Sequence, residues 1–174
     1  MKKKIIYIID IVLLVVLVVI DQILKELAVV KLKDKQAYSL IDGVLEFNYL
    51  ENKGAAFGML QNQKIFFIFV AVVFLAVIVF VLIKAPSEVR YNKLHVLLVM
   101  IGAGAIGNLI DRVRLNYVVD FIYFKLINFP IFNFADICVT VATFVLVIMI
   151  LFVFDDNDFN FLSFKPEKFR ELKK

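Results

Sequence analysis

Cysteine and histidine are almost absent from the 174-residue chain, which has one of each, Cys138 and His95. A single cysteine excludes an intramolecular disulfide. A catalytic thiol would need a histidine partner, but His95 stands well before Cys138 and is expected at the opposite end of a membrane span. Cys138 lies inside an apolar run and is expected to be a small buried core residue. No histidine-rich zinc pattern and no serine–histidine set is visible, so we expect no metal and no organic cofactor.

Polar residues are also scarce, because hydrophobic residues make up 63% of the chain and the mean hydropathy is +0.91. Soluble domains are roughly half apolar, so this composition predicts an integral membrane protein. The net charge of +4 and the pI near 9.1 have a simple explanation. Most lysines stand at the ends of apolar runs, where they meet lipid head groups and set orientation. No nucleic-acid-binding motif accompanies them, so we expect no nucleic-acid partner.

Four apolar runs are long enough to cross a hydrocarbon core of about 30 Å. The first follows Lys2–Lys4 in the manner of a secretory signal peptide, but it is too long and has Asp21-Gln22-Ile23 where a small-residue cleavage site would stand. We predict an all-α membrane domain over residues 1–154. Its four transmembrane helices are expected at about residues 5–29, 65–83, 94–110 and 132–154. Residues 155–174 are predicted to form a charged cytoplasmic tail, either disordered or a helix on the surface.

The distribution of lysine and arginine predicts that both termini are cytoplasmic. Eleven of these residues fall on the side of the N-terminus, the 84–93 loop and the tail, against seven on the other side. The insertion 31–63 is then extracytoplasmic. Asp42-Gly43 is typical of a hairpin turn, and residues 45–50 roughly alternate with the period of a strand. We therefore predict a small β-sheet on the outer membrane surface, between the first and second helices.

Carboxylates and amides beside the apolar runs are the candidates for function. A charged residue at the centre of a membrane helix costs about 2.5–3.5 kcal/mol on insertion scales, so such residues are functional candidates by default. Asp120 and Asp136 both have apolar neighbours on either side, and Asn133 lies one helical turn before Asp136, where it can hold that carboxylate. Asp111 is adjacent to Arg112 and two residues from Arg114, which predicts an ionised, paired carboxylate with a structural role.

Other polar and small residues allow more than one interpretation. Asp21 and Lys25 share a helix face, either as a local ion pair or as a support for a polar site. The small residues from Asn52 to Gly58 are consistent with a plain turn. Ala103 and Gly107 form a small-x-x-x-small pair that lets another helix approach closely. Thr140 and Thr143 can bond back to the helix backbone, so no chemistry is assigned to them.

Two close carboxylates in an apolar site share a proton and titrate as a unit. That arrangement suits peptide hydrolysis, in which one carboxylate accepts a proton from water while the protonated one polarises the scissile carbonyl. A proton-coupled carrier would use the same carboxylates, and a structural bundle could also contain them. Carriers usually have internal repeats or broken helices. No repeat is visible in this chain, and four spans are few.

Five motifs resemble, in order, those of the bacterial lipoprotein signal peptidases, or signal peptidase II. They are Asp21-Gln22-x-x-Lys25, Asn52-x-Gly54-Ala55-Ala56-Phe57, Gly107-Asn108-x-x-Asp111-Arg112, Val119-Asp120-Phe121 and Phe132-Asn133-x-Ala135-Asp136. The resemblance spans about residues 5–154. The tail from Asp155 onward matches no motif of the family, and the stretch between Asp120 and Asn133 is compact.

The resemblance implies a membrane aspartyl endopeptidase of the bacterial plasma membrane, active near the extracytoplasmic face. Such an enzyme removes the signal peptide of prolipoproteins just before a diacylglyceryl-modified cysteine. Asp120 and Asp136 would be the catalytic pair. Asn52, Asn108, Arg112 and Asn133 would bind substrate, and Asp21, Lys25, Gly54 and Asp111 would support the site. The implied partners are the lipid-modified substrate and membrane lipid, and a monomer would suffice.

Overall fold

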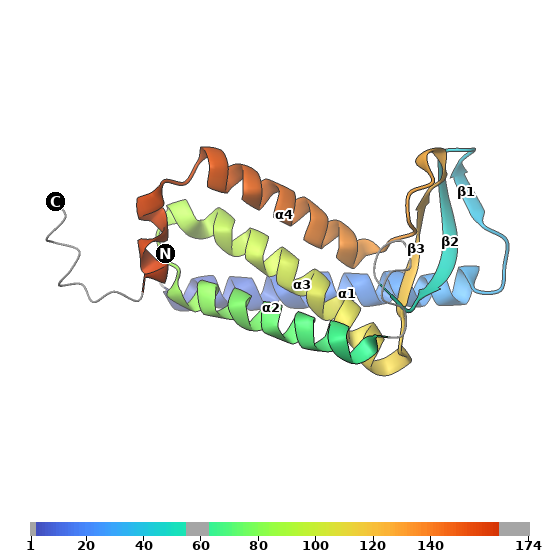
Figure 1. Ribbon diagram of the computed structural model, residues 1–174, viewed down its shortest axis with the longest axis horizontal. Coiled ribbons are helices and arrows are strands. Elements are labelled where there is room, and N and C mark those ends of the chain that lie inside the picture. The colour runs from blue at the N-terminus through green and yellow to red at the C-terminus, as the bar shows by residue number, and fades with distance from the viewer. Residues whose placement is uncertain (1–2, 55–62, 164–174) are drawn as a thin grey trace, which may run out of the picture.

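Four long helices run side by side in the computed structural model, which describes residues 3–54 and 63–163 (Figure 1). They are α1 (Lys3–Leu32), α2 (Lys64–Lys84), α3 (Asn92–Leu115) and α4 (Phe134–Phe152). All four are long and apolar enough to cross a membrane. The four predicted helices are therefore confirmed, although α1 and α3 extend beyond their predicted limits and α4 begins and ends within them.

Helix α3 is the central element, because it packs against α1, α2 and α4. Eleven of its residues are buried, whereas α2 buries only Ile78 and leaves its other apolar residues exposed or half-buried. A helix that is apolar on all sides and mostly exposed fits a lipid environment rather than water. The polar residues of the chain therefore gather along α3 and at the ends of the bundle.

Glycines let α3 approach its neighbours closely. A Cβ atom on Gly107 would collide with the Asp21 carboxylate, and one on Gly104 would collide with the Ala135 carbonyl and lie 2.6 Å from Val139. The predicted close approach at Gly107 is confirmed. The tight contact with α4 also uses Gly104, one helical turn earlier, whereas the sequence prediction had paired Gly107 with Ala103.

A three-stranded antiparallel sheet lies across one end of the bundle (Figure 1). Strands β1 (Tyr38–Ile41) and β2 (Leu45–Asn52) form the predicted hairpin, with Gly43 at φ +72° in its turn. The third strand, β3 (Val118–Phe124), pairs with β2 but comes from the connection between α3 and α4. The prediction placed the whole sheet between the first two helices and missed β3. Its first four residues are all buried, and a strand buried on both faces shows no alternation.

The pairing of β2 with β3 contains one irregularity. Phe47 pairs with Ile122 and Leu50 pairs with Asp120, so β2 spans three residues where β3 spans two. One extra residue on one strand is the definition of a β-bulge. Beyond it the ladder resumes and Asn52 pairs with Val118, which places the side chains of Asn52 and Asp120 on the same face of the sheet.

The compact stretch after Asp120 doubles back on β3. It forms the short helix η3 (Lys125–Ile127), turns at Asn128 with φ +49°, and returns so that Phe132 pairs with Ile122. The amides of Phe121 and Ile122 donate to the Phe132 carbonyl at 3.0 and 2.8 Å. This return places the start of α4 directly beside β3.

The far end of the bundle is covered by η4 (Asp156–Leu162), a 3₁₀ helix. Arg90 binds the Asp158 carboxylate, and the Tyr91 hydroxyl donates to the Asp158 carbonyl at 3.0 Å. The Tyr91 ring stacks on Phe154 with centroids 6.1 Å apart. The predicted tail thus begins as a short helix on the surface of the bundle, one of the two forms expected. Its residues 164–174 lie outside the described part of the chain.

We predict that Gly104→Ala lowers the melting temperature in detergent, because the new Cβ meets the Ala135 backbone, which cannot move freely. Overpacking of this kind costs about 1–3 kcal/mol. The matched control is Gly102→Ala, whose Cβ would lie 3.8 Å or more from its nearest neighbours. It should leave the melting temperature unchanged or raise it slightly. Equal melting temperatures for the two variants would contradict a tight α3–α4 contact at Gly104.

Candidate active site

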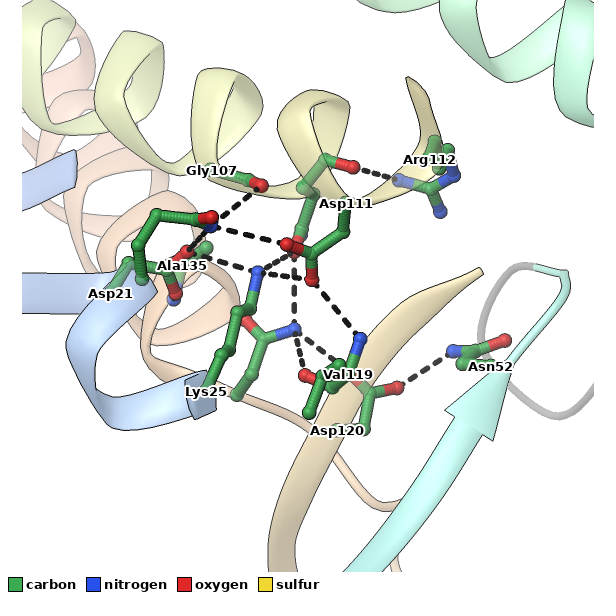
Figure 2. A network of polar contacts seen from close by, with 12 residues as sticks. Asp21, Lys25, Asn52, Gly107, Asp111, Arg112, Val119, Asp120 and Ala135 are labelled. Carbon is green, nitrogen blue, oxygen red and sulfur yellow. Dashed lines mark hydrogen bonds and ion pairs between the residues drawn. The ribbon is translucent and has the colours of Figure 1, made fainter. Parts of the chain in front are cut away.

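All ten residues predicted for the site belong to one polar network at the sheet end of the bundle, part of which is drawn in Figure 2. Helix α1 supplies Asp21 and Lys25, the sheet region supplies residues 52, 54 and 120, and the ends of α3 and α4 supply the rest. Hydrogen bonds or ion pairs join every member, directly or through another: Asp21, Lys25, Asn52, Gly54, Asn108, Asp111, Arg112, Asp120, Asn133 and Asp136.

Asn133 connects the two candidate catalytic carboxylates. Its side-chain amide donates to Asp120 at 2.7 Å and to the side-chain oxygen Oδ1 of Asn108 at 3.1 Å. It is also the N-cap of α4. Its side-chain oxygen accepts from the backbone amide of Asp136 at 3.0 Å, and its backbone amide donates to the Asp136 carboxylate at 3.1 Å. The predicted hydrogen bond between Asn133 and Asp136 is confirmed, and as a reciprocal capping box it fixes both groups.

Asp120 lies at the centre of β3 and is 2% exposed. Its carboxylate accepts from Asn133 and, at 2.8 Å, from Asn52. Burial, together with the nearby charge of Asp136, raises its pKa from 3.8 to about 7, and the two amide donors oppose the shift. Near neutral pH, Asp120 therefore exists in both protonated and ionised forms.

Asp136 lies in the first turn of α4 and lines the same cavity as Asp120. Besides the Asn133 amide, its carboxylate accepts from the Asn108 side chain at 2.8 Å. The N-terminus of a helix stabilises a negative charge within its first turn. The two aspartates therefore sit in different settings, one on a buried strand and one at a helix N-terminus.

Lys25 is a buried ammonium group, 3% exposed, which is rare unless the charge is paired. It lies 2.9 Å from Asp21, 3.0 Å from Asp111 and 2.9 Å from the side-chain oxygen Oδ1 of Asn108. The ion pair between Asp21 and Lys25 is confirmed, and it also supports the polar site. The prediction that Asp111 pairs with the neighbouring arginines was wrong. Its ion pair is with Lys25, because the packing of α1 on α3 brings Lys25 alongside it.

Both carboxylates of this ion cluster also accept hydrogen bonds from backbone amides (Figure 2). Asp21 accepts from the Ala135 amide at 2.9 Å, and Asp111 accepts from the Val119 amide at 3.0 Å. These residues immediately precede Asp136 and Asp120 in the chain. Each supporting carboxylate thus fixes the backbone next to one candidate catalytic aspartate.

Arg112 turns away from the ion cluster. Its guanidinium lies 4.8 Å from the centre of the Phe67 ring and donates to the Gly54 carbonyl at 3.3 Å. Gly54 is fixed in turn by its amide, which donates to Asn52 at 3.0 Å, so this part of the small-residue segment is more than a plain turn. The rest of that segment, Ala55 to Gly58, lies outside the described residues.

Sequence reasoning missed two contributors to the site. The Gln22 amide donates to Asp111 at 3.1 Å and to the Gly107 carbonyl at 3.3 Å. Its position beside Asp21 within a quoted motif was the available signal. Phe67 lies in an unbroken apolar run and gave no signal at all.

A cavity of about 610 Å³ lies between α2, α3, α4 and β3. Its charged and amide side chains are those of Asn52, Asn108, Arg112, Asp120 and Asp136. Its walls are apolar, formed by Phe67, Ile137, Val141 and the segment from Phe124 to Phe132. A chamber with carboxylates at one place and hydrocarbon walls elsewhere suits a substrate that is itself largely apolar.

The remaining reactive side chains lie outside this network. His95 pairs with Asp10 at 2.7 Å, and Cys138 is buried as predicted. Neither Asp10 nor its pairing was foreseen. Within residues 3–54 and 63–163, no group of three or more His, Cys, Asp or Glu side chains could hold a metal ion. The cation that pairs with the carboxylates of Asp21 and Asp111 is the ammonium group of Lys25.

Comparison with known proteins decides the family. The family model described as "Signal peptidase (SPase) II" matches residues 13–152, which is most of the chain. The chain belongs to the signal peptidase II family. The lipoprotein signal peptidase of Caldanaerobacter subterraneus subsp. tengcongensis is 46% identical over 143 residues, covering 82% of this chain and 95% of that protein. The Clostridium tetani lipoprotein signal peptidase is 36% identical, covering 82% and 92%.

Solved structures share the fold of this chain. One bacterial membrane enzyme superimposes with a TM-score of 0.74 at 31% identity, covering 90% of this chain and 93% of that chain. A second has a TM-score of 0.72 at 32% identity, covering 83% and 94%. The chain is therefore a multi-pass membrane protein of a protease family, and the resemblance found in its motifs is confirmed. The alternative of a proton-coupled carrier finds no support.

Lys25→Met should lower the melting temperature in detergent by a large amount. It removes the ammonium while leaving Asp21 and Asp111 buried, and breaking a buried pair in this way costs about 3–5 kcal/mol. The control is Lys33→Met, whose partner Glu51 is part-exposed, so a much smaller loss is expected. Equal melting temperatures for the two variants would contradict a stabilising role of the buried ion cluster.

Asp120→Asn should stabilise the protein more at pH 8 than at pH 5. With a pKa of about 7, Asp120 binds its proton more tightly in the folded chain than in the unfolded chain, where the value is 3.8. Its contribution to stability is present below about pH 4 and is lost as pH rises through about 7. Ionisation then opposes folding by on the order of 4 kcal/mol, which asparagine avoids. Melting curves of both proteins at the two pH values test this, and a pH-independent difference would contradict it.

Proposed function

We propose that this signal peptidase II removes the signal peptide from prolipoproteins, cutting on the N-terminal side of a diacylglyceryl-modified cysteine. It acts as an aspartyl endopeptidase with Asp120 and Asp136 as the catalytic pair. The observation that supports this most directly is Asn133, which hydrogen-bonds both carboxylates beside an otherwise apolar cavity. The lipoprotein signal peptidases that the chain resembles over most of its length support the substrate class.

The two aspartates take different parts in hydrolysis. Asp120, with its raised pKa, holds the shared proton and donates a hydrogen bond to the scissile carbonyl. Asp136, whose carboxylate accepts hydrogen bonds from Asn108 and Asn133, accepts a proton from water as that water attacks the carbonyl carbon. The amine leaves with a proton returned by the pair, which restores the starting state. The low polarity around the pair strengthens each of these interactions.

Substrate binding falls to the polar residues around the pair. Asn52, Asn108 and Asn133 orient the two carboxylates by direct donation. Asn52 and Asn108 line the cavity where the peptide backbone would lie, whereas Asn133 is fully buried and acts through the carboxylates that it orients. Arg112 lines the cavity with its guanidinium over Phe67, so its free N–H groups can bind a substrate carbonyl. Asp21, Lys25 and Asp111 support these groups from outside the cavity lining. Gly54 lines the cavity and supports the site through its hydrogen bonds with Asn52 and Arg112.

The catalytic end of the bundle faces the extracytoplasmic side of a bacterial plasma membrane, with both termini in the cytoplasm. The lysine and arginine counts support this orientation. A lipid-modified substrate then arrives laterally, with its acyl chains in the outer leaflet against the apolar walls. One chain supplies every residue of the network, so a monomer is sufficient for activity.

The test is cleavage of a diacylglyceryl-modified prolipoprotein peptide in detergent micelles, comparing the wild type with three variants. Asp120→Asn and Asp136→Asn should each reduce cleavage at least about 10³-fold, because asparagine cannot transfer the proton. Asp111→Asn keeps the pair and should retain some cleavage. Melting curves confirm that each variant is folded. Normal cleavage by Asp120→Asn would refute the assigned pair, and no cleavage by the wild type would refute the protease function.

A further inference from the structure

Thr140 is a cavity residue with an unused hydroxyl. It lies on α4, four residues after Asp136, and therefore on the same face of the helix. It lines the cavity and is exposed there. Its side chain forms no hydrogen bond with any residue of the described ranges 3–54 and 63–163. The expectation that it bonds back to its own helix is not met.

The surroundings make that hydroxyl a binding group. The neighbouring α4 residues that line the cavity, Ile137 and Val141, are apolar. Phe67, which lines the same cavity from α2, is apolar as well. A hydroxyl without a partner in apolar surroundings is unfavourable, with a penalty that a hydrogen bond removes. Since the protein offers none, a bound substrate entering the cavity supplies the natural partner.

The position of Thr140 identifies which part of a substrate it meets. Four residues of α-helix rise about 6 Å, so Thr140 lies about that far along α4 from Asp136, toward the bundle interior and away from the sheet. A signal peptide lies within the membrane on the N-terminal side of its cleavage site. An extended chain advances about 3.3 Å per residue, so 6 Å corresponds to about two residues before the scissile bond.

We propose that Thr140 is a positioning residue that hydrogen-bonds the backbone of the signal peptide about two residues before the scissile bond. This inference rests on the proposed function. The bond fixes how deeply the peptide enters the cavity, and so which peptide bond lies between the two aspartates. Because it is made to the bound peptide before reaction, its main effect is on KM rather than on kcat.

The experiment compares Thr140→Val and Thr140→Ser with wild type on the lipid-modified peptide. Valine has the same shape but no hydroxyl, so KM should rise about fivefold with kcat little changed, as for one neutral hydrogen bond. Serine keeps the hydroxyl and should restore KM to within about twofold of wild type. The matched control is Thr143→Val, which changes the same helix at a residue that is not among the described cavity lining and should leave KM unchanged.

A second set of substrates separates a backbone contact from a merely structural effect. In three peptides, an ester replaces the amide at the first, second or third residue before the cut, which removes one N–H and weakens one carbonyl. For wild type, the ester at the second residue should raise KM about fivefold. For Thr140→Val that ester should cause no further rise in KM, since the hydrogen bond between Thr140 and the peptide backbone is already absent.

The outcomes distinguish this inference from the function on which it rests. Wild-type KM for Thr140→Val, or equal losses with every ester in both proteins, would overturn the role of Thr140 while cleavage itself stands. If Thr140→Val does not melt cooperatively, the ester at the second residue still tests the role, and an unchanged KM for that ester with both wild type and Thr140→Ser would also overturn it. Absence of cleavage by the wild type, or cleavage by Asp120→Asn, would overturn the proposed function and this inference together.

Discussion

The site depends on one buried charge, the ammonium group of Lys25 between Asp21 and Asp111. Each of these carboxylates has a second contact, to the backbone amide that precedes Asp136 or Asp120. One cation on α1 therefore sets the relative position of a helix start and a strand that are distant in the sequence. Buried ion pairs contribute little net stability, because desolvation opposes their attraction. Their contribution here is geometrical, since only one arrangement of α1, α3, α4 and β3 satisfies the three charges.

Around Asp120 and Asp136, the proposed catalytic pair, the protein uses neutral amides instead of cations. Three asparagines donate to the two carboxylates, while Lys25 contacts neither and Arg112 is turned toward Phe67. A cation in direct contact would favour the ionised form of both carboxylates. Amides orient the oxygens without adding a positive charge. The charged groups support the backbone, whereas the groups that contact Asp120 directly are neutral amides. This arrangement explains why Asp120 has a pKa near 7 within so polar a cluster.

Much of the site was visible in the sequence, because polar residues are unfavourable among apolar runs and stand out there. The helices followed from run length, and the hairpin followed from Asp42-Gly43. Strand β3 was missed because its burial on both faces removes the alternation that identifies strands. The partner of Asp111 was wrong because neighbours in sequence lie about 100° apart around a helix, while Lys25 becomes its neighbour only through packing. Phe67 could not be found, since nothing separates it from other phenylalanines until the helices are assembled.

The β-bulge in β2 limits where this protein can tolerate an insertion or a deletion of residues. Side chains alternate between the two faces of a strand, so a shift of one residue sends each to the opposite face. A residue inserted or deleted between the bulge and Asn52 would turn this asparagine away from Asp120. The hairpin turn around Gly43 lies before the bulge and carries no such constraint. Length variation among homologous chains is thus expected at the tip of the sheet and excluded within a few residues of the Asn52–Asp120 contact.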